Sequence, residues 1–293
     1  MPARSLAPGG RWRAFLVFTV LTGSASFAGQ PPLSGRPPEL AQVGLPNAGE
    51  AAELLGQFRN AGVPGEYYLE FQLQAMPRRG DTRVSLGRLW GGRNRQGAVT
   101  RVEVIDSSGG VHRFLLQNGP QAAIWRLVEG QPVKLDVAAA FEPIIPGVDL
   151  TAFDLQMPYL YWPDARLQSI NRIRGRPAHA FLFRAPPAFS VTAGAPVDTV
   201  RAFLDTQYNA LVQTELLDAT GRPLRTLSLV SIKTVDQQTI PRTVDFRNDV
   251  TRDKTRFHVT AAALHLDLGP APFEPAALAD DIRPPADQVV RLD

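Results

Sequence analysis

The feature that most constrains this chain is an alternation of apolar and polar residues that recurs along most of its length. Residues 69–75 read LEFQLQA, and residues 111–117 and 224–232 also carry short strand-like runs. Alternation with a period of two is typical of strands that bury one face. Turn signals such as residues 106–110 and 118–119 separate these runs at short intervals. The intervals leave little room for crossover helices, so we predict an antiparallel meander.

We predict a mainly β (α+β) fold, a curved antiparallel half-barrel of about ten or eleven strands with two or three short helices as a lid. A sheet of that many strands must curl. One helix is expected to begin near Asn47, because Glu50 lies at capping-box spacing from it. A second is expected in residues 149–157, ended by Pro158. Helices against the concave face of such a sheet would enclose an apolar cavity.

The N-terminus has the pattern of a secretory signal peptide. Arg4, Arg11 and Arg13 precede the apolar run 14–21, and Ser26 and Ala28 are small residues at the spacing that a signal peptidase needs. The apolar run is shorter than the roughly 20 residues that a spanning helix needs. We therefore predict export to the periplasm, cleavage near Ala28 and no transmembrane segment in the mature chain.

Charge and cysteine content exclude several classes of function. The formal charge of the whole chain is +3, but removal of the three arginines of residues 1–28 leaves 28 basic against 28 acidic residues. A neutral mature chain gives little support to binding of a nucleic-acid backbone. The chain has no cysteine, which excludes disulfides, thiolate chemistry and acyl attachment to cysteine.

Proline-rich segments divide the chain. We assign residues 1–28 to the signal peptide, 29–46 to a proline-rich linker, 47–275 to one domain and 276–293 to a C-terminal tail.

No motif for catalysis or metal binding is present. The chain lacks the nucleophile-elbow, zinc-protease and dinucleotide-binding patterns, and His112, His179, His258 and His265 lack the spacing of a metal site. We therefore expect no enzyme, no cofactor and no metal. A secreted hydrolase with paired carboxylates is the less favoured alternative, because sequence alone does not place two carboxylates across a cleft.

The densest aromatic cluster lies between two prolines, in residues 158–163 (PYLYWP). Phe153, Trp90 and Trp125 are further large aromatic residues. Together these side chains could line an apolar cavity or fill a core, and both interpretations remain open.

One stretch of the chain resembles a known family, the outer-membrane lipoprotein-sorting protein-like family, related to the Lol lipoprotein carriers. The resemblance covers about residues 150–275 and rests on the order of several short motifs. They are residues 153–163, 174–179, 218–224, 240–244, 254–259 and 273–275. Residues 204–211 depart from the hairpin that is usual in the family, with Tyr208 and Asn209 expected at its turn, and residues 50–148 carry little that matches.

The resemblance implies a half-barrel whose apolar cavity binds acyl chains or lipoproteins in the periplasm. Its partners would be acylated protein or lipid, and inner- or outer-membrane lipoprotein machinery. The implied lid or rim residues are Phe153, Leu155, Tyr159, Leu160, Tyr161 and Trp162, with Trp90 and Trp125 as cavity wall. The alternative is an envelope interaction or lipid-sensing protein that transports nothing.

Overall fold

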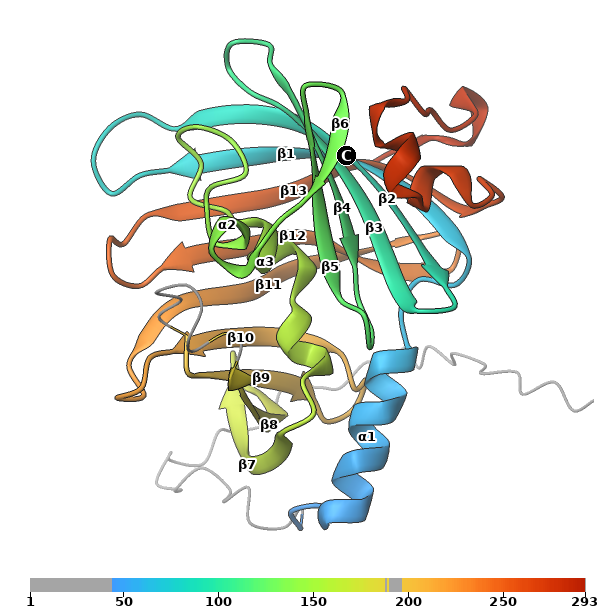
Figure 1. The fold of residues 1–293 in the computed structure, drawn as a ribbon. Helices are drawn as coiled ribbons and strands as arrows, with labels where there is room; N and C mark the ends of the chain where they lie inside the picture. Colours follow the sequence, from blue (N-terminus) through green and yellow to red (C-terminus); the bar gives the residue numbers. More distant parts are fainter. Residues whose placement is uncertain (1–43, 188, 190–196, 293) are drawn as a thin grey trace, which may run out of the picture. The chain divides into compact units, whose positions relative to one another are not determined.

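Two antiparallel meanders meet at the centre of one open, curved sheet (Figure 1). The computed structural model describes residues 44–187, 189 and 197–292. The first meander runs from β1 to β6 and the second from β7 to β13, and the two join where β1 pairs with β13. The strands are β1 (Glu66–Met76), β2 (Arg83–Asn94), β3 (Gly97–Ile105), β4 (Val111–Gln117), β5 (Ala123–Val128), β6 (Gln131–Lys134), β7 (Ala165–Ile173), β8 (Arg176–Arg184), β9 (Thr199–Asp205), β10 (Leu211–Leu217), β11 (Pro223–Val235), β12 (Gln238–Asn248), β13 (Lys254–Leu266) and β14 (Val290–Arg291).

The helices are short apart from the first. The α-helices of the described residues are α1 (Ala48–Asn60), α2 (Val137–Ala140) and α3 (Ala152–Gln156), and 3₁₀ turns form η2 (Pro158–Tyr161), η3 (Ala271–Phe273), η4 (Pro275–Ala279) and η5 (Ala286–Gln288). The predicted cap of α1 is confirmed, since the Asn47 side chain accepts from the Glu50 amide and the Glu50 carboxylate accepts from the Asn47 amide. The predicted signal peptide, its cleavage near Ala28 and most of the predicted linker lie outside the described residues.

The predicted class, a mainly β open half-barrel, is confirmed, but the strand count is too low. In the described part of the chain the sheet has 14 strands rather than ten or eleven. The prediction did not include β6, an edge strand that contains Pro132, or β14, which is two residues long. Neither segment is long enough to display an alternating pattern, and proline weakens the strand signal further. The expected hairpin at Tyr208 and Asn209 is present, with Asn209 at φ 49° between β9 and β10.

The described residues form three separate apolar clusters, and the two largest lie on opposite faces of the sheet. Leu69, Phe71 and Leu73 of β1 point to the concave face, and their cluster includes residues from both meanders, α1, α2, α3 and η2. Tyr68, the neighbour of Leu69, points the other way and belongs to a second cluster with Trp90. Successive side chains of a strand point to opposite faces, which separates these neighbours.

Two glycines of β2 let aromatic rings of β1 lie flat across the concave face. A Cβ on Gly87 would lie 2.2 Å from Cζ of Phe71, and one on Gly91 would lie 2.0 Å from Cζ of Tyr67. Both glycines stand directly opposite those aromatic residues in the β1–β2 register. Any side chain at these two positions would displace the ring, so glycine is required for the close approach.

Both edges of the sheet are covered. The helix α1 packs against β7 at one edge, and η4 packs against β6 at the other. Coverage by a helical segment protects an edge strand from pairing with another chain. No helix of the described residues is long and apolar enough to cross a membrane.

Candidate functional site

The concave face is occupied by a segment that we call the lid segment, residues 151–162, which contains α3 and η2. Thr151 caps α3, because its hydroxyl accepts from the Asp154 amide while the Asp154 carboxylate accepts from the Thr151 amide. Met157 has left-handed backbone angles (φ 51°) and ends α3, and Pro158 then begins η2. Capping at one end and a left-handed turn before proline at the other explain why this helix is only five residues long.

Aromatic rings form the centre of the lid segment. The Phe153 ring stacks on Phe141 with centroids 4.3 Å apart, and lies 5.8 Å from Tyr159 and 6.4 Å from Trp162. Tyr159 and Trp162 meet edge to face at 6.2 Å. Phe153 and Tyr159 are each only 1% exposed. Aromatic pairs in these geometries contribute about 0.5–1.5 kcal/mol beyond the burial of their area.

The structure brings together all six side chains that the sequence assigned to a lid or rim. Phe153, Tyr159, Leu160 and Trp162 are buried in the concave cluster, and Leu155 and Tyr161 pack against it half-buried. The concave face is therefore filled by side chains of this chain. Their role in binding remains a prediction, and it is taken up below.

A half-buried arginine holds the start of the lid segment to the sheet. Arg225 of β11 donates from Nη1 to Oδ1 of Asp149 (2.8 Å) and from Nε to Oδ1 of Asp154 (3.1 Å), with Nη2 2.7 Å from Oδ2 of Asp154. Nη2 also donates to the Asp149 carbonyl at 3.0 Å. We call this group the arginine clamp.

Polar contacts of three further side chains hold the rest of the lid segment. The Gln156 side chain donates to the carbonyls of Gln117 (2.8 Å) and Ala123 (3.1 Å), which ties α3 to the β4–β5 hairpin. Arg59 of α1 donates to the carbonyls of Leu160 (2.6 Å) and Trp162 (3.1 Å). The Tyr159 hydroxyl lies 3.2 Å from that of Thr214. The lid segment is thus attached at a few defined points.

Burial shifts the ionisation of two groups in the lid segment. Burial raises the pKa of Asp154 above its ordinary value, although Arg225 and the Thr151 hydrogen bonds oppose the shift. Burial also raises the pKa of the Tyr159 hydroxyl. For both groups the neutral form is the one that an apolar surrounding favours.

The structure does not bring Trp90 and Trp125 together with the lid segment. Trp90 pairs with Tyr68 across β1 and β2, and Trp125 pairs with Leu115 across β5 and β4, on the convex face. Both tryptophans alternate along their strands with residues of the concave cluster, such as Leu89 and Ile124. The sheet itself therefore separates them from Phe153 and Trp162.

The convex face of β3 to β6 is covered by a segment that we call the C-terminal strap, residues 270–292, which contains η3, η4, η5 and β14. Most of the predicted C-terminal tail, residues 276–293, falls in it. Leu278 of η4 is fully buried among Tyr68, Trp90 and Leu115. Arg101, also fully buried, lies over the Trp90 ring at 5.4 Å and donates to the strap carbonyls of Ala277 (2.8 Å) and Leu278 (3.2 Å).

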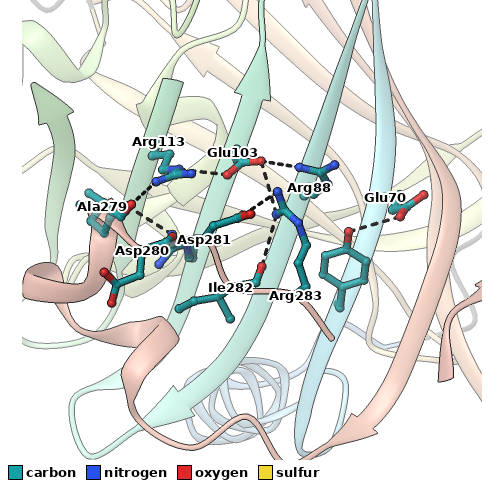
Figure 2. A network of polar contacts seen from close by, with 12 residues as sticks. Glu70, Arg88, Glu103, Arg113, Ala279, Asp280, Asp281, Ile282 and Arg283 are labelled. Carbon is teal, nitrogen blue, oxygen red and sulfur yellow. Dashed lines mark hydrogen bonds and ion pairs between the residues drawn. The ribbon is translucent and has the colours of Figure 1, made fainter. Parts of the chain in front are cut away.

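A network of charges fastens the strap further (Figure 2). Glu103 of β3 accepts from Nη1 of Arg88 (2.6 Å) and Nε of Arg113 (2.9 Å), and Arg283 of the strap lies 3.6 Å from it. Arg113 also donates to the carbonyl of Ala279. Burial by itself raises the pKa of Glu103. The hydrogen bonds from Arg88 and Arg113 outweigh burial and hold this pKa below its ordinary value.

A mixed polar and apolar hollow of about 290 Å³ opens at the rim of the sheet, which we call the rim hollow. One wall is the end of the sheet, and the other is the loop between α2 and α3. The lining residues are Ala75, Met76, Pro77, Arg83, Pro143, Gly147, Val148, Asp149, Asp253, Lys254 and Thr255.

The histidines are dispersed. Nε2 of His112 lies 2.7 Å from Asp106, and Nδ1 of His258 lies 2.9 Å from the Thr243 hydroxyl. Burial lowers the pKa of His179. Within the part of the chain that the structure describes, no cluster of three or more His, Asp or Glu side chains could hold a metal ion.

Comparison with known proteins identifies the fold. An outer membrane lipoprotein-sorting protein domain from Vibrio parahaemolyticus superposes with a TM-score of 0.66 at 15% identity, covering 80% of this chain and all of that one. A DUF1329 family protein from Desulfovibrio piger superposes at 0.65 with 12% identity, covering 77% and 96%. The chain has a LolA-like fold.

A LolA superfamily protein from Nitrosomonas europaea has the same architecture, with a TM-score of 0.57 at 11% identity and coverage of 76% and 97%. The resemblance noted in the sequence is thereby supported at the level of the fold. No family model and no curated protein matches the sequence. The superpositions establish the LolA-like fold. At identities this low they do not establish the function, which must be argued from the residues of this chain.

Sequence reasoning missed the polar residues that hold the lid segment. Arg225 lies in phase with Leu227 and Leu229 on a predicted strand, so it was a charged residue on an apolar face. A charge in that position must be paired, which is the signal that could have found the clamp. Arg59 and Gln156 carried no such signal, because their partners are backbone carbonyls distant in sequence.

Proposed function

We propose that this protein is a periplasmic carrier or binder of acyl chains or lipoproteins. The observation that carries the proposal is the lid segment itself, an apolar and aromatic plug that fills the concave face of a LolA-like fold. The plug is held to the rest of the fold by side-chain packing and by polar contacts from a small number of side chains. A surface of that kind can exchange its own side chains for an apolar ligand when the plug moves.

The energetics favour such an exchange. Each CH₂ group that leaves water for the concave face gains about 0.8 kcal/mol, so a long acyl chain gains roughly 10 kcal/mol before the cost of ordering it. Displacement of Phe153 and Trp162 from the cluster offsets part of this gain. Near-balance between the two terms suits a carrier, which must release its cargo as well as bind it.

The location and the partners follow from the same proposal. The predicted signal peptide and the LolA-like fold support a periplasmic protein that meets acylated proteins or lipids and the lipoprotein machinery of the inner or outer membrane. We expect Phe153, Leu155, Tyr159, Leu160, Tyr161 and Trp162 to contact the acyl chain or to move aside for it.

The experiment that tests the proposal is native mass spectrometry of residues 29–293, purified under mild conditions from a periplasm. We expect extra mass from phospholipid, fatty acid or acylated peptide, and uptake of a fluorescent fatty acid by the delipidated protein. A ligand-free mass together with no uptake would refute the carrier function.

Variants of aromatic residues on the two faces of the sheet test which face binds lipid. Trp162→Ala and Tyr159→Ala should weaken lipid binding while the protein stays folded. Trp125→Phe is the control, because Trp125 lies on the opposite face and should not change binding. If all three variants bind lipid as well as the wild type, the lid segment is not part of the site.

A second candidate is an envelope interaction or lipid-sensing protein without a transport role. The observation that favours it is that the concave face is occupied by the chain's own side chains. Under this alternative the protein would transfer no lipid or lipoprotein to an acceptor, and would be recovered with another envelope protein after crosslinking in cells.

A further inference from the structure

We propose that the rim hollow is a subsite for the head group of a phospholipid-type amphiphile, one that carries a phosphate together with an ammonium or hydroxyl donor. This inference rests on the proposed function, because it assumes that the attached acyl chain lies under the lid segment. The argument uses the position of the hollow, its charges and its unpartnered polar atoms.

The position of the rim hollow suits an amphiphile. Its inner wall includes Ala75 and Val148, and both are buried members of the concave cluster that the lid segment fills. Its outer wall carries Arg83, Asp253 and Lys254. A ligand with its polar end in the hollow would therefore direct its apolar end into the concave cluster. At about 290 Å³ the hollow is at the lower end of the range for small-molecule pockets, roughly 300–1,000 Å³, which suits a head group rather than a whole lipid.

Arg83 is the cation that would hold the phosphate. Its guanidinium lies against Gly147, where a Cβ would approach Nη1 to 2.7 Å, so it extends from the start of β2 across to the loop between α2 and α3. In the described ranges no carboxylate pairs with Arg83, whereas Lys254 is bound to Asp245 at 3.3 Å. An arginine fork matches the geometry of a phosphate.

The remaining polar groups favour a zwitterion over a simple anion. Asp149 and Asp253 supply carboxylates to the same hollow. Oδ2 of Asp149 and the hydroxyl of Thr255 are buried and lack a hydrogen-bond partner among the described residues. A buried polar atom without a hydrogen-bond partner destabilises the fold. A head group with both an acceptor for Arg83 and Thr255 and a donor for Asp149 would satisfy these groups when the loop between α2 and α3 moves.

The test compares two ligands with the same acyl chain. The probes are a lysophosphatidylethanolamine and the matching monoacylglycerol, titrated against the delipidated protein below their micelle concentrations. Hydrogen bonds to charged groups are stronger than those between neutral groups. We expect the wild type to bind the phospholipid about tenfold tighter or more, since 1.4 kcal/mol corresponds to a factor of ten.

Variants of two arginines near the β1–β2 turn decide the assignment. Arg83→Gln should lose the preference for the phospholipid while its affinity for the monoacylglycerol stays unchanged. Arg79→Gln, an exposed arginine outside the hollow, should keep the preference. Both positions are exposed, so both variants should fold.

The outcomes separate this inference from the proposed function. A preference that survives in Arg83→Gln, or equal binding of the two probes by the wild type, would overturn the head-group subsite and leave the carrier function standing. Failure of the wild type to bind either probe would overturn both.

Discussion

The lid segment on the concave face and the C-terminal strap on the convex face are both built of short helical turns, but different forces hold them. The lid segment packs aromatic rings against the sheet and is attached by the arginine clamp and by polar contacts of three further side chains. The strap lies over fully buried Arg101 and a network of charges centred on Glu103 (Figure 2).

This difference indicates which covering can be exchanged. Apolar contacts are non-directional, so an acyl chain can replace Phe153 or Trp162 with little loss. A charge network is directional, and removal of one partner leaves a buried charge uncompensated. We infer that the strap is a permanent part of the fold, while the lid segment is the element that moves.

The largest expected effect is that of Glu103→Gln in the strap network. The change leaves Arg88 and Arg113 without their buried partner, so the free energy of unfolding should fall by about 3–5 kcal/mol. Urea denaturation measures it, with exposed Glu129→Gln as the control, which should change stability by less than about 0.5 kcal/mol. An effect no larger than the control's would mean that the strap is not held by this network.

A smaller effect is expected for Arg225→Gln in the clamp. Asp149 is partly exposed and Asp154, with its raised pKa, can take up a proton, so we expect a loss of about 2–3 kcal/mol. Hydrogen exchange should quicken in α3 and η2 but not in η4 or β14. Arg222→Gln, in the exposed turn before β11, is the matched control. Equal acceleration in the strap would remove the distinction between the two coverings.

Tyr159→Phe should have a modest effect, because it removes only the hydroxyl that contacts Thr214. The loss should be about 1 kcal/mol, typical of one hydrogen bond. Tyr208→Phe, at a side chain that is 65% exposed, serves as the control. A loss of several kcal/mol would show that the lid segment depends on this hydrogen bond rather than on its aromatic packing.

The smallest expected effect is on the pH dependence of stability, which should have opposite signs for the strap network and the lid segment. The lowered pKa of Glu103 adds stability that is present above the unfolded value, about 4.3, and is lost as pH falls through the folded pKa. The raised pKa of Asp154 works in the opposite direction: its contribution is complete below the unfolded value, about 3.9, and is lost as pH rises through the folded pKa.

Denaturation of Glu103→Gln and Asp154→Asn across this pH range checks both signs. The quantity to follow is the free energy of unfolding of the wild type minus that of the variant. On acidification this quantity should fall for Glu103→Gln and rise for Asp154→Asn. Parallel slopes for the two variants would contradict the opposite ionisation behaviour of the two faces.

Much of the architecture could be predicted because its signals are local. The alternation in β1, the capping box of Asn47 and Glu50, and the aromatic segment that ends at a proline each depend on neighbours within a few residues. The charges that organise the site could not be predicted in this way. Arg225 meets Asp149 and Asp154 from 76 and 71 residues away, and Arg101 meets the strap from 176 residues away.

By itself the sequence determined the class of fold, an antiparallel meander long enough to curl, because side-chain alternation and short turns act within each hairpin. Only the tertiary structure decided which face each aromatic residue occupies. Trp90 and Phe153 were indistinguishable as large apolar residues. The pairing of β2 with β1 turned Trp90 to the convex face, whereas the packing of α3 on the sheet placed Phe153 on the concave face. Register is a property of strands distant in sequence, and a shift of one residue exchanges the two faces.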